Sequence, residues 1–161
     1  MREIPISKGH IAYVDDDDFD RINKYRWCYH GNGYAARGYH DNGMLIIVKL
    51  HQEIMGKPKN GYEIDHINGN KLDNRKSNLR IVTHQQNVFN SKSKTPSTPS
   101  EHTSLHKGVY WRKNRKRWVS YITLNGKRTY LGSFQAEQEA ALAYNKAAEK
   151  QYGIYARLNN V

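Results

Sequence analysis

Cysteine and long apolar runs are nearly absent from this sequence. Its 161 residues include one cysteine, Cys28, so neither an internal disulfide nor a cysteine zinc knuckle can brace the fold. No segment approaches the ~20 apolar residues of a membrane span, and the N-terminus lacks the apolar stretch of a signal peptide. We expect a protein that is not secreted and works in a reducing compartment, with Cys28 as a small core residue.

Negative charge is scarce in the last third of the chain. The formal net charge is +11 and the mean hydropathy is −0.92. Residues 1–90 hold 13 Lys and Arg against 11 Asp and Glu, whereas residues 105–161 hold 11 against three. Residues 105–134 carry eight basic residues and no acid. This distribution predicts a polyanion partner that binds mainly to the last third.

Residues 62–90 alternate short apolar runs with polar turns. Ile64–Ile67 and Leu79–Val82 have the length and composition of strands, and Asn68-Gly69-Asn70 between them is a strong turn signal. Thr83 followed by Gln86 three residues later fits a capping box at a helix start. The pattern predicts strand, loop, strand and helix, in that order.

Polar side chains in this stretch suit phosphodiester hydrolysis. Asp65 and Asn87 supply hard oxygen ligands of the kind that Mg²⁺ or Mn²⁺ prefers. An ion held by few protein ligands keeps positions for water and a phosphate oxygen. His66 can take a proton from an attacking water near neutral pH. Because neighbours on a regular strand face opposite sides, we expect the strand to end or twist at Asp65-His66.

These residues resemble the HNH nucleases of the ββα-metal type, closest to the homing endonucleases of phages and introns. The motif of that family falls on Asp65-His66, Asn78 and Asn87. The resemblance implies that His66 is the general base and that Asp65 and Asn87 bind one divalent ion. It implies that Asn78 holds the loop and orients His66. One such site cuts one strand, so we expect nicking by a monomer, and a double-strand break only by a dimer or two successive nicks.

Two further histidines stand near this motif. His51 lies in a short helical segment, Leu50–Met55, which Gly56 and Pro58 end. A structural or supporting role and a direct contact with phosphate or metal both remain open for it. His84, in the exposed first turn of the capped helix, is the other possible supporting residue.

Residues 1–50 give weaker signals. Ile4–Ile6 and His10–Val14 resemble short strands, and Asp15–Asp18 suits a solvated helix N-terminus. Turns at Gly31–Gly33 and Asp41–Gly43 predict hairpins. We divide the chain into parts of different composition: a β-rich bracing region at 1–50, an HNH module at 51–90, a linker at 91–104 and a DNA-binding unit at 105–161. The Ser-, Thr-, Lys- and Pro-rich linker either tethers passively or lies along DNA.

Residues 105–161 have the pattern of a three-stranded sheet with one helix. Lys107–Lys113, Arg117–Leu124 and Lys127–Phe134 read as strands, and Asn125-Gly126 is a strong hairpin signal. Glu137–Tyr152 places small and aromatic residues on one helical face. Alternation along the middle strand predicts a face toward the helix and an exposed basic and aromatic face; the residues of that strand on the exposed face are Arg117, Val119, Tyr121 and Thr123.

The stretches 107–110, 130–134 and 139–144 (KGVY, YLGSF and EAALAY), with Trp118, resemble the AP2 DNA-binding domain, whose sheet enters the major groove. The resemblance implies that Arg112, Arg128 and Tyr130 read bases. The basic residues around the first turn are better suited to clamp phosphates. The expected DNA contacts are therefore Arg112, Lys113, Arg115, Lys116, Arg117, Tyr121, Arg128 and Tyr130.

The sequence thus predicts an α+β protein that joins a nuclease module to a DNA reader. We expect a site-selective DNA endonuclease of the homing type that uses one Mg²⁺ or Mn²⁺. Its partner is double-stranded DNA, and it acts as a monomer or dimer in the cytoplasm of a bacterial host, encoded by a phage. The rival interpretation is a sequence-specific DNA-binding regulator that does not cleave.

Overall fold

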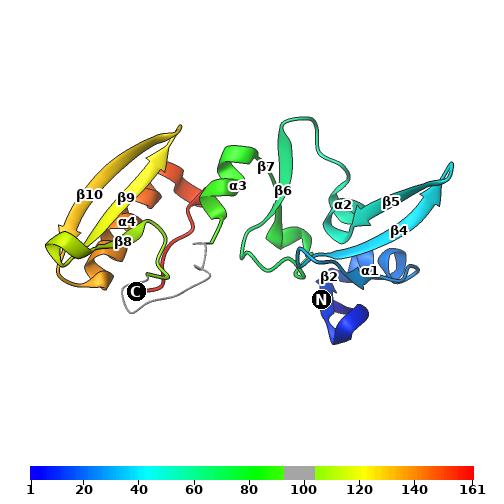
Figure 1. Cartoon of the computed structure of the whole chain (residues 1–161). Helices are drawn as coiled ribbons and strands as arrows, with labels where there is room; N and C mark the ends of the chain where they lie inside the picture. The colour runs from blue at the N-terminus through cyan, green and yellow to red at the C-terminus, as the bar shows by residue number, and fades with distance from the viewer. Residues whose placement is uncertain (93–103) are drawn as a thin grey trace. The chain divides into compact units, whose positions relative to one another are not determined.

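The chain folds into two compact units. The computed structural model describes residues 1–92 and 104–161 (Figure 1). One unit comprises Met1–Asn87 and the other Val88–Val161. Both combine helices with antiparallel sheets, which confirms the α+β class. Most of the linker predicted at 91–104 lies outside the described residues, and the predicted four-part division stays a prediction. No helix in the described ranges combines the length and apolarity that a bilayer crossing needs.

The first unit contains three small sheets and short helices. β1 pairs with β2, β3 and β5 flank β4, and β6 pairs with β7, each antiparallel. The elements up to the end of the β6–β7 hairpin are β1 (Arg2–Pro5), η1 (Ser7–Gly9), β2 (Ile11–Val14), α1 (Asp16–Ile22), β3 (Cys28–Tyr29), β4 (Ala35–Asp41), β5 (Met44–Lys49), α2 (Leu50–Met55), β6 (Tyr62–His66), η2 (Lys76–Asn78) and β7 (Leu79–Thr83). α3 (His84–Asn90) follows.

The core of this unit joins the N-terminal strands to the segment around the predicted nuclease motif. Its fully buried members include Ile4, Val14 and Leu50, and Leu72 of the loop after β6 packs against them. The loop is also pinned by backbone hydrogen bonds, since Tyr13 donates to the Leu72 carbonyl at 2.8 Å and accepts from Asn74 N–H at 2.8 Å. The N-terminal region therefore holds the loop that connects β6 to β7.

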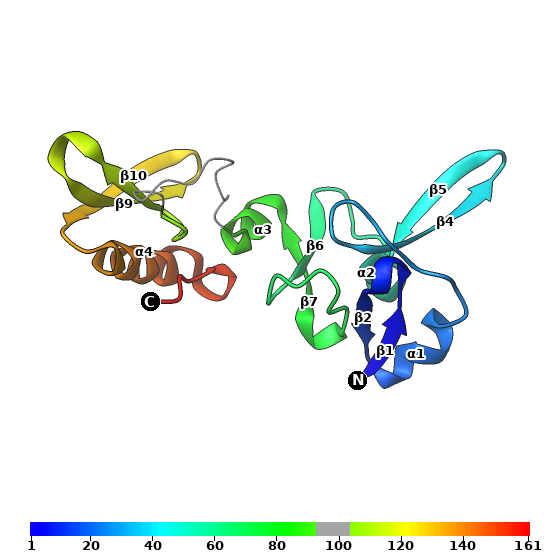
Figure 2. The same cartoon turned by 60° about the horizontal axis from the view of Figure 1, so that its bottom comes forward.

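The second unit is a three-stranded sheet covered on one face by a helix (Figure 2). The strand order is β10-β9-β8, and α4 packs on all three strands. Its elements are β8 (Val109–Arg112), η3 (Lys113–Arg115), β9 (Arg117–Leu124), β10 (Lys127–Phe134), α4 (Glu137–Tyr152) and η4 (Gly153–Tyr155). Buried Ala140, Ala141 and Ala148 let the helix approach the sheet closely.

The second unit also holds the residues that end α3. The ring of Phe89 stacks on Tyr152 with a centroid separation of 3.8 Å. The ammonium group of Lys107 donates to the carbonyls of Val88, Phe89 and Ser91 at 3.1, 2.7 and 2.8 Å. Carbonyls at a helix C-terminus have no partner inside the helix, and a cation there also complements the helix dipole. Lys107 therefore caps this short helix.

Three sequence-based expectations are wrong. Cys28 is exposed rather than in the core. Neighbours along a strand face opposite sides, and on β3 it is Tyr29 that packs against the core. Val119 lies on the predicted exposed face but is only 4% accessible. It is on the middle strand and has a neighbour on each side, Tyr110 on β8 and Ser133 on β10. Asp18 of the acidic run is not solvated: it is buried and paired with Arg21 and Lys76 at 2.7 and 2.9 Å.

Candidate active site and DNA-binding face

The β6–β7 hairpin and the start of α3 carry the predicted nuclease residues. β6 ends at His66, and its register with β7 sets Asp65 opposite Arg80. The capping box predicted at α3 is present: Thr83 N–H donates to Gln86 Oε1 at 2.9 Å, and Gln86 N–H donates to Thr83 Oγ1 at 3.3 Å. This reciprocal cap fixes the helix start and thereby places Asn87, one turn into α3.

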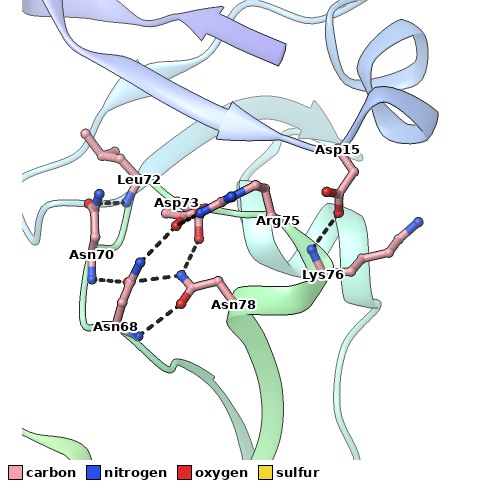
Figure 3. Close-up of polar contacts among 8 residues, drawn as sticks. All are labelled: Asp15, Asn68, Asn70, Leu72, Asp73, Arg75, Lys76 and Asn78. Carbon is pink, nitrogen blue, oxygen red and sulfur yellow. Dashed lines mark hydrogen bonds and ion pairs between the residues drawn. The ribbon is translucent and has the colours of Figure 1, made fainter. Parts of the chain in front are cut away.

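A network of asparagines shapes the loop between the two strands (Figure 3). Asn78 Oδ1 accepts from Asn68 N–H at 3.0 Å, and Asn78 Nδ2 donates to Asn68 Oδ1 and to the Asp73 carbonyl at 3.1 and 2.7 Å. Arg75 holds the Asp73 carboxylate through two 2.7 Å contacts. The hydrogen bonds of the Asn78 side chain join the start of the loop at Asn68 to its middle at Asp73. Asn78 therefore holds the loop in one conformation.

His66 is buried at the end of β6, with 4% of its surface exposed. Its Nε2 lies 3.3 Å from the side-chain oxygen of Asn74. This contact with a side-chain amide helps to fix the position of the ring. Burial lowers the pKa of His66 below its usual value, although the Asn74 contact and the Asp65 charge oppose the shift. The neutral ring that a general base needs is therefore favoured at pH 7.

Asp65 is also buried and is bound by Arg80. Arg80 donates from Nε and Nη2 to the same oxygen, Oδ2, at 2.9 and 2.8 Å. This pairing satisfies one oxygen of a carboxylate that burial would otherwise penalise. Two residues earlier on the same strand face lies Glu63, whose carboxylate accepts from Asn87 Nδ2 and contacts His84 Nδ1 at 2.8 Å. These two contacts lower the pKa of Glu63, the Asn87 hydrogen bond more strongly.

Two more rings enclose His66. The centroid of the His51 ring lies 5.1 Å from that of the His66 ring. The centroid of the Tyr34 ring lies 5.0 Å from that of His51 and 6.0 Å from that of His66. His51 is buried, and its Nδ1 has no hydrogen-bond partner within the described parts of the chain. Burial, followed by the His66 and Lys49 charges, lowers the pKa of His51 to about 3. His51 is therefore a neutral ring that keeps a polar atom for a further partner.

An open pocket of about 420 Å³ lies in this region, although neither Asp65 nor His66 is among its lining residues. Its wall includes His51, Glu63 and Asn87, and its rim carries Lys49, Lys57 and Lys59. Lysines around a polar hollow attract a phosphate backbone. The pocket therefore combines an anion-attracting rim with the acidic and amide groups of β6 and α3.

The two side chains predicted to bind a metal ion are oxygen donors. Asp65 and Asn87 offer a carboxylate and an amide oxygen, which suit Mg²⁺ or Mn²⁺ and not a soft metal. Across residues 1–92 and 104–161, no group of three or more His, Cys, Asp or Glu is arranged to hold a metal ion. A centre with two protein oxygens remains compatible with Mg²⁺, which keeps several waters and takes a substrate phosphate as a ligand.

The second unit presents a basic and aromatic sheet face opposite α4. The register places Tyr121 beside Tyr130 and Thr123 beside Arg128 across β9 and β10, and Arg112 beside Arg117 across β8 and β9. The Arg112 and Arg117 side chains carry like charges on adjacent strands, which is unfavourable without an anion. Lys113 and Arg115 in η3, with the left-handed Lys116 after them, extend the basic surface at the turn.

Arg128 lies across the aromatic side chains of this face. Its guanidinium carbon is 3.9 Å from the centroid of Tyr121 and 4.7 Å from that of Tyr110. Stacking on rings holds a guanidinium in one plane while its N–H groups stay available. Such a preorganised fork suits bidentate contact with a guanine edge.

We expect Arg128→Ala to weaken DNA binding by about 1–3 kcal/mol and to relax base preference at one position. Fluorescence anisotropy with a panel of duplexes that vary one base pair at a time measures both effects. Lys127→Ala is the matched control, because Lys127 pairs with Leu124 and faces the other side of the sheet. A uniform loss of affinity across the panel would place Arg128 on phosphate instead.

Four residues of the site were given no role from the sequence alone. Tyr34 and Asn74 reach His66 through tertiary folding, and an Asn between Asp and Arg in a polar loop resembles turn chemistry. The positions of Arg80 and Glu63 could have been predicted from the sequence. Pairing of the two predicted strands sets Arg80 opposite Asp65, and Glu63, two residues before Asp65, lies on the same face of its strand. His84 is exposed, as predicted, and contacts Glu63.

Comparisons with known proteins agree with both halves of this arrangement. Residues 52–89 match the HNH endonuclease family and residues 104–154 match the AP2 domain. The uncharacterized HNH endonuclease L560 of Acanthamoeba polyphaga mimivirus is 32% identical over 157 residues, which cover 96% of this chain and 77% of that protein. Protein 3.8 of Escherichia phage T7 is 33% identical over 110 residues, which cover 68% of this chain and 86% of that protein.

The last third has plant relatives as well. The dehydration-responsive element-binding protein 2D of Arabidopsis thaliana is 44% identical over 63 residues, which cover 38% of this chain and 30% of that protein. No solved structure gives a significant match to the chain. HNH nucleases generally use a divalent metal ion, which agrees with the oxygen ligands described above. The match with the mimivirus protein along nearly the whole chain shows that this protein belongs to the HNH endonuclease family and carries an AP2 domain for DNA binding.

Proposed function

We propose that this protein is a metal-dependent homing-type endonuclease that nicks one strand of double-stranded DNA. The observation that carries the proposal is that Asp65 and His66 end one strand of a short hairpin and Asn87 lies on the helix that follows it. Glu63, on the Asp65 face of that strand, holds the Asn87 amide, and both line a pocket that also includes three lysines. A DNA-binding module in the same chain supplies the site selection that a homing enzyme needs.

In the reaction His66 acts as the general base. Its imidazole takes a proton from the water that attacks the phosphorus, while the Asn74 contact at Nε2 helps to fix the ring. Asp65 and Asn87 would hold one Mg²⁺ or Mn²⁺, which would supply charge stabilisation at the phosphate and at the departing 3′ oxygen. Asn78 keeps the loop closed around this arrangement, and the lysines of the rim bind the DNA backbone.

A monomer with one such centre cuts one strand. A double-strand break then requires a dimer or two successive nicks. The relatives in a mimivirus and in phage T7 support a mobile element carried by a virus. The phage T7 relative leads us to place the activity in the cytoplasm of a bacterial cell infected by a phage.

The second candidate function is a DNA-binding regulator without cleavage. The AP2 domain favours it, because one plant relative is named an element-binding protein and another an ethylene-responsive transcription factor. Such a regulator does not require a buried imidazole next to a carboxylate and a helix-borne amide, so the first unit favours the nuclease.

Removal of the metal distinguishes the two functions. With Mg²⁺ or Mn²⁺, supercoiled plasmid should convert to the open-circular form before any linear form, and excess chelator should stop the conversion. Asp65→Asn keeps the shape of the side chain but removes its charge, so it should lower the nicking rate by about 10-fold or more through weaker metal binding. Its salt-dependent DNA binding should stay unchanged. Cutting that continues in chelator would reject the metal, and tight binding without any nicking would favour the regulator.

A further inference from the structure

The amide of Asn87 is held in one orientation by Glu63. Asn87 Nδ2 donates to Glu63 Oε2, and the other oxygen of that carboxylate contacts His84 Nδ1 at 2.8 Å. Glu63 is half-buried on β6 and lines the same pocket as Asn87. The carboxylate therefore has a partner on each oxygen, and one of these partners is a predicted metal ligand.

The two ends of a side-chain amide have opposite chemistry. The oxygen can bind a cation, whereas the NH₂ group only donates hydrogen bonds and repels a cation. A half-turn about the last side-chain bond exchanges the two ends, and that torsion has a broad, two-fold preference. A ligand amide therefore needs a neighbour that tells its ends apart. An ionised carboxylate does so, because it only accepts hydrogen bonds and so selects the NH₂ end.

We infer that Glu63 is a positioning residue that turns the oxygen of Asn87 toward the divalent ion by holding its NH₂ group. The inference rests on the proposed function, in which Asn87 binds that ion. His84 supports the same arrangement, because its contact at the second oxygen keeps the carboxylate from rotating. Glu63 acts through Asn87 and is not itself a ligand of the metal.

A set of four full-length chains tests this role: the wild type, Glu63→Gln, Asn87→Asp and the double variant. Glutamine has the shape of glutamate, but its amide can both donate and accept, so it no longer selects one end of Asn87. Calorimetric titration with Mn²⁺ in the absence of DNA measures metal affinity directly. Glu63→Gln should weaken that affinity by about 10–100-fold, the usual effect of removing a partner that orients a ligand.

The Asn87→Asp background provides the matched control. A carboxylate at position 87 has two equivalent oxygens, so no neighbour is needed to orient it. In that background Glu63→Gln should change Mn²⁺ affinity by less than about threefold, or should strengthen it by removing a like charge beside the new carboxylate. Thermal unfolding of all four chains, and their DNA binding, should show that each variant folds.

Two outcomes would overturn the inference. A similar loss of affinity from Glu63→Gln in both backgrounds would make Glu63 a ligand or a structural residue. If Glu63→Gln leaves Mn²⁺ affinity unchanged in the chain that keeps Asn87, the amide does not need Glu63 to orient it. A different result would reject the proposed function: a wild-type protein that binds Mn²⁺ and DNA but does not nick plasmid.

Discussion

His66→Ala should reduce the rate of plasmid nicking by about 10²–10⁴-fold, the usual contribution of a general base. The ring lies at the end of β6, buried and in contact with Asn74 at Nε2, and the proposed mechanism gives the proton to no other group. Single-turnover nicking of supercoiled plasmid at saturating Mg²⁺ measures the loss. Affinity for DNA should change little, because the AP2 domain carries most of the excess charge.

The control for this loss is a histidine outside the site. His40 is exposed on β4, so His40→Ala should nick at the wild-type rate. The variant at position 66 should also keep its Mn²⁺ affinity, since His66 is assigned to the proton and not to the ion. Nicking at the wild-type rate by His66→Ala would reject the base assignment, and a parallel loss of Mn²⁺ affinity would make His66 a ligand.

The largest effect on stability should come from Gly108→Ala in the second unit. Gly108 has φ +77°, and a Cβ there would lie 2.2 Å from Tyr144 Cδ2 and 2.5 Å from the Tyr121 carbonyl. Tyr144 is a buried residue of α4, and Tyr121 N–H donates to the Gly108 carbonyl at 2.8 Å. Neither neighbour can yield easily, so strain and overpacking together should cost about 2–5 kcal/mol.

Gly126→Ala separates the two causes of that loss. Gly126 has a similar φ of +75°, but no atom lies within 4 Å of its would-be Cβ. It should lose only the backbone term, about 1–2 kcal/mol. Urea unfolding followed by fluorescence measures both variants. Equal losses would show that the close approach of Gly108 to Tyr144 contributes nothing.

Local signals in the sequence determined much of the fold. α2 and α4 and the strands β9 and β10 begin and end where the sequence predicts. Each has clear punctuation, such as Gly56 after α2, Asn125-Gly126 between the two strands and Gly153 after α4. Alternation along β9 identified its helix-facing side as well, because that pattern reflects burial in a single sheet.

Burial that depends on contacts distant in sequence was not predicted. Val119 is buried on a face that alternation predicts to be exposed. Cys28 is exposed although its neighbour on β3, Tyr29, packs against the core. In the site, the tertiary fold brings Tyr34 and His51 to His66 from β-rich and helical segments earlier in the chain. A single sequence has no local pattern for such encounters. The roles of Asp65, His66, Asn78 and Asn87 stay predictions. Plasmid nicking and Mn²⁺ titration test those of Asp65, His66 and Asn87.

The exposed position of Cys28 makes the wild-type chain ready for spectroscopy. It is the only thiol in the sequence and lies on the surface of the first unit, so a maleimide dye attaches at one place without mutagenesis. Energy transfer from that dye to a fluorophore at either end of a target duplex would report the orientation in which the nuclease unit arrives on DNA. Energy transfer in the same sample, followed over time, would report whether the enzyme reverses its orientation on the duplex between one nick and the next.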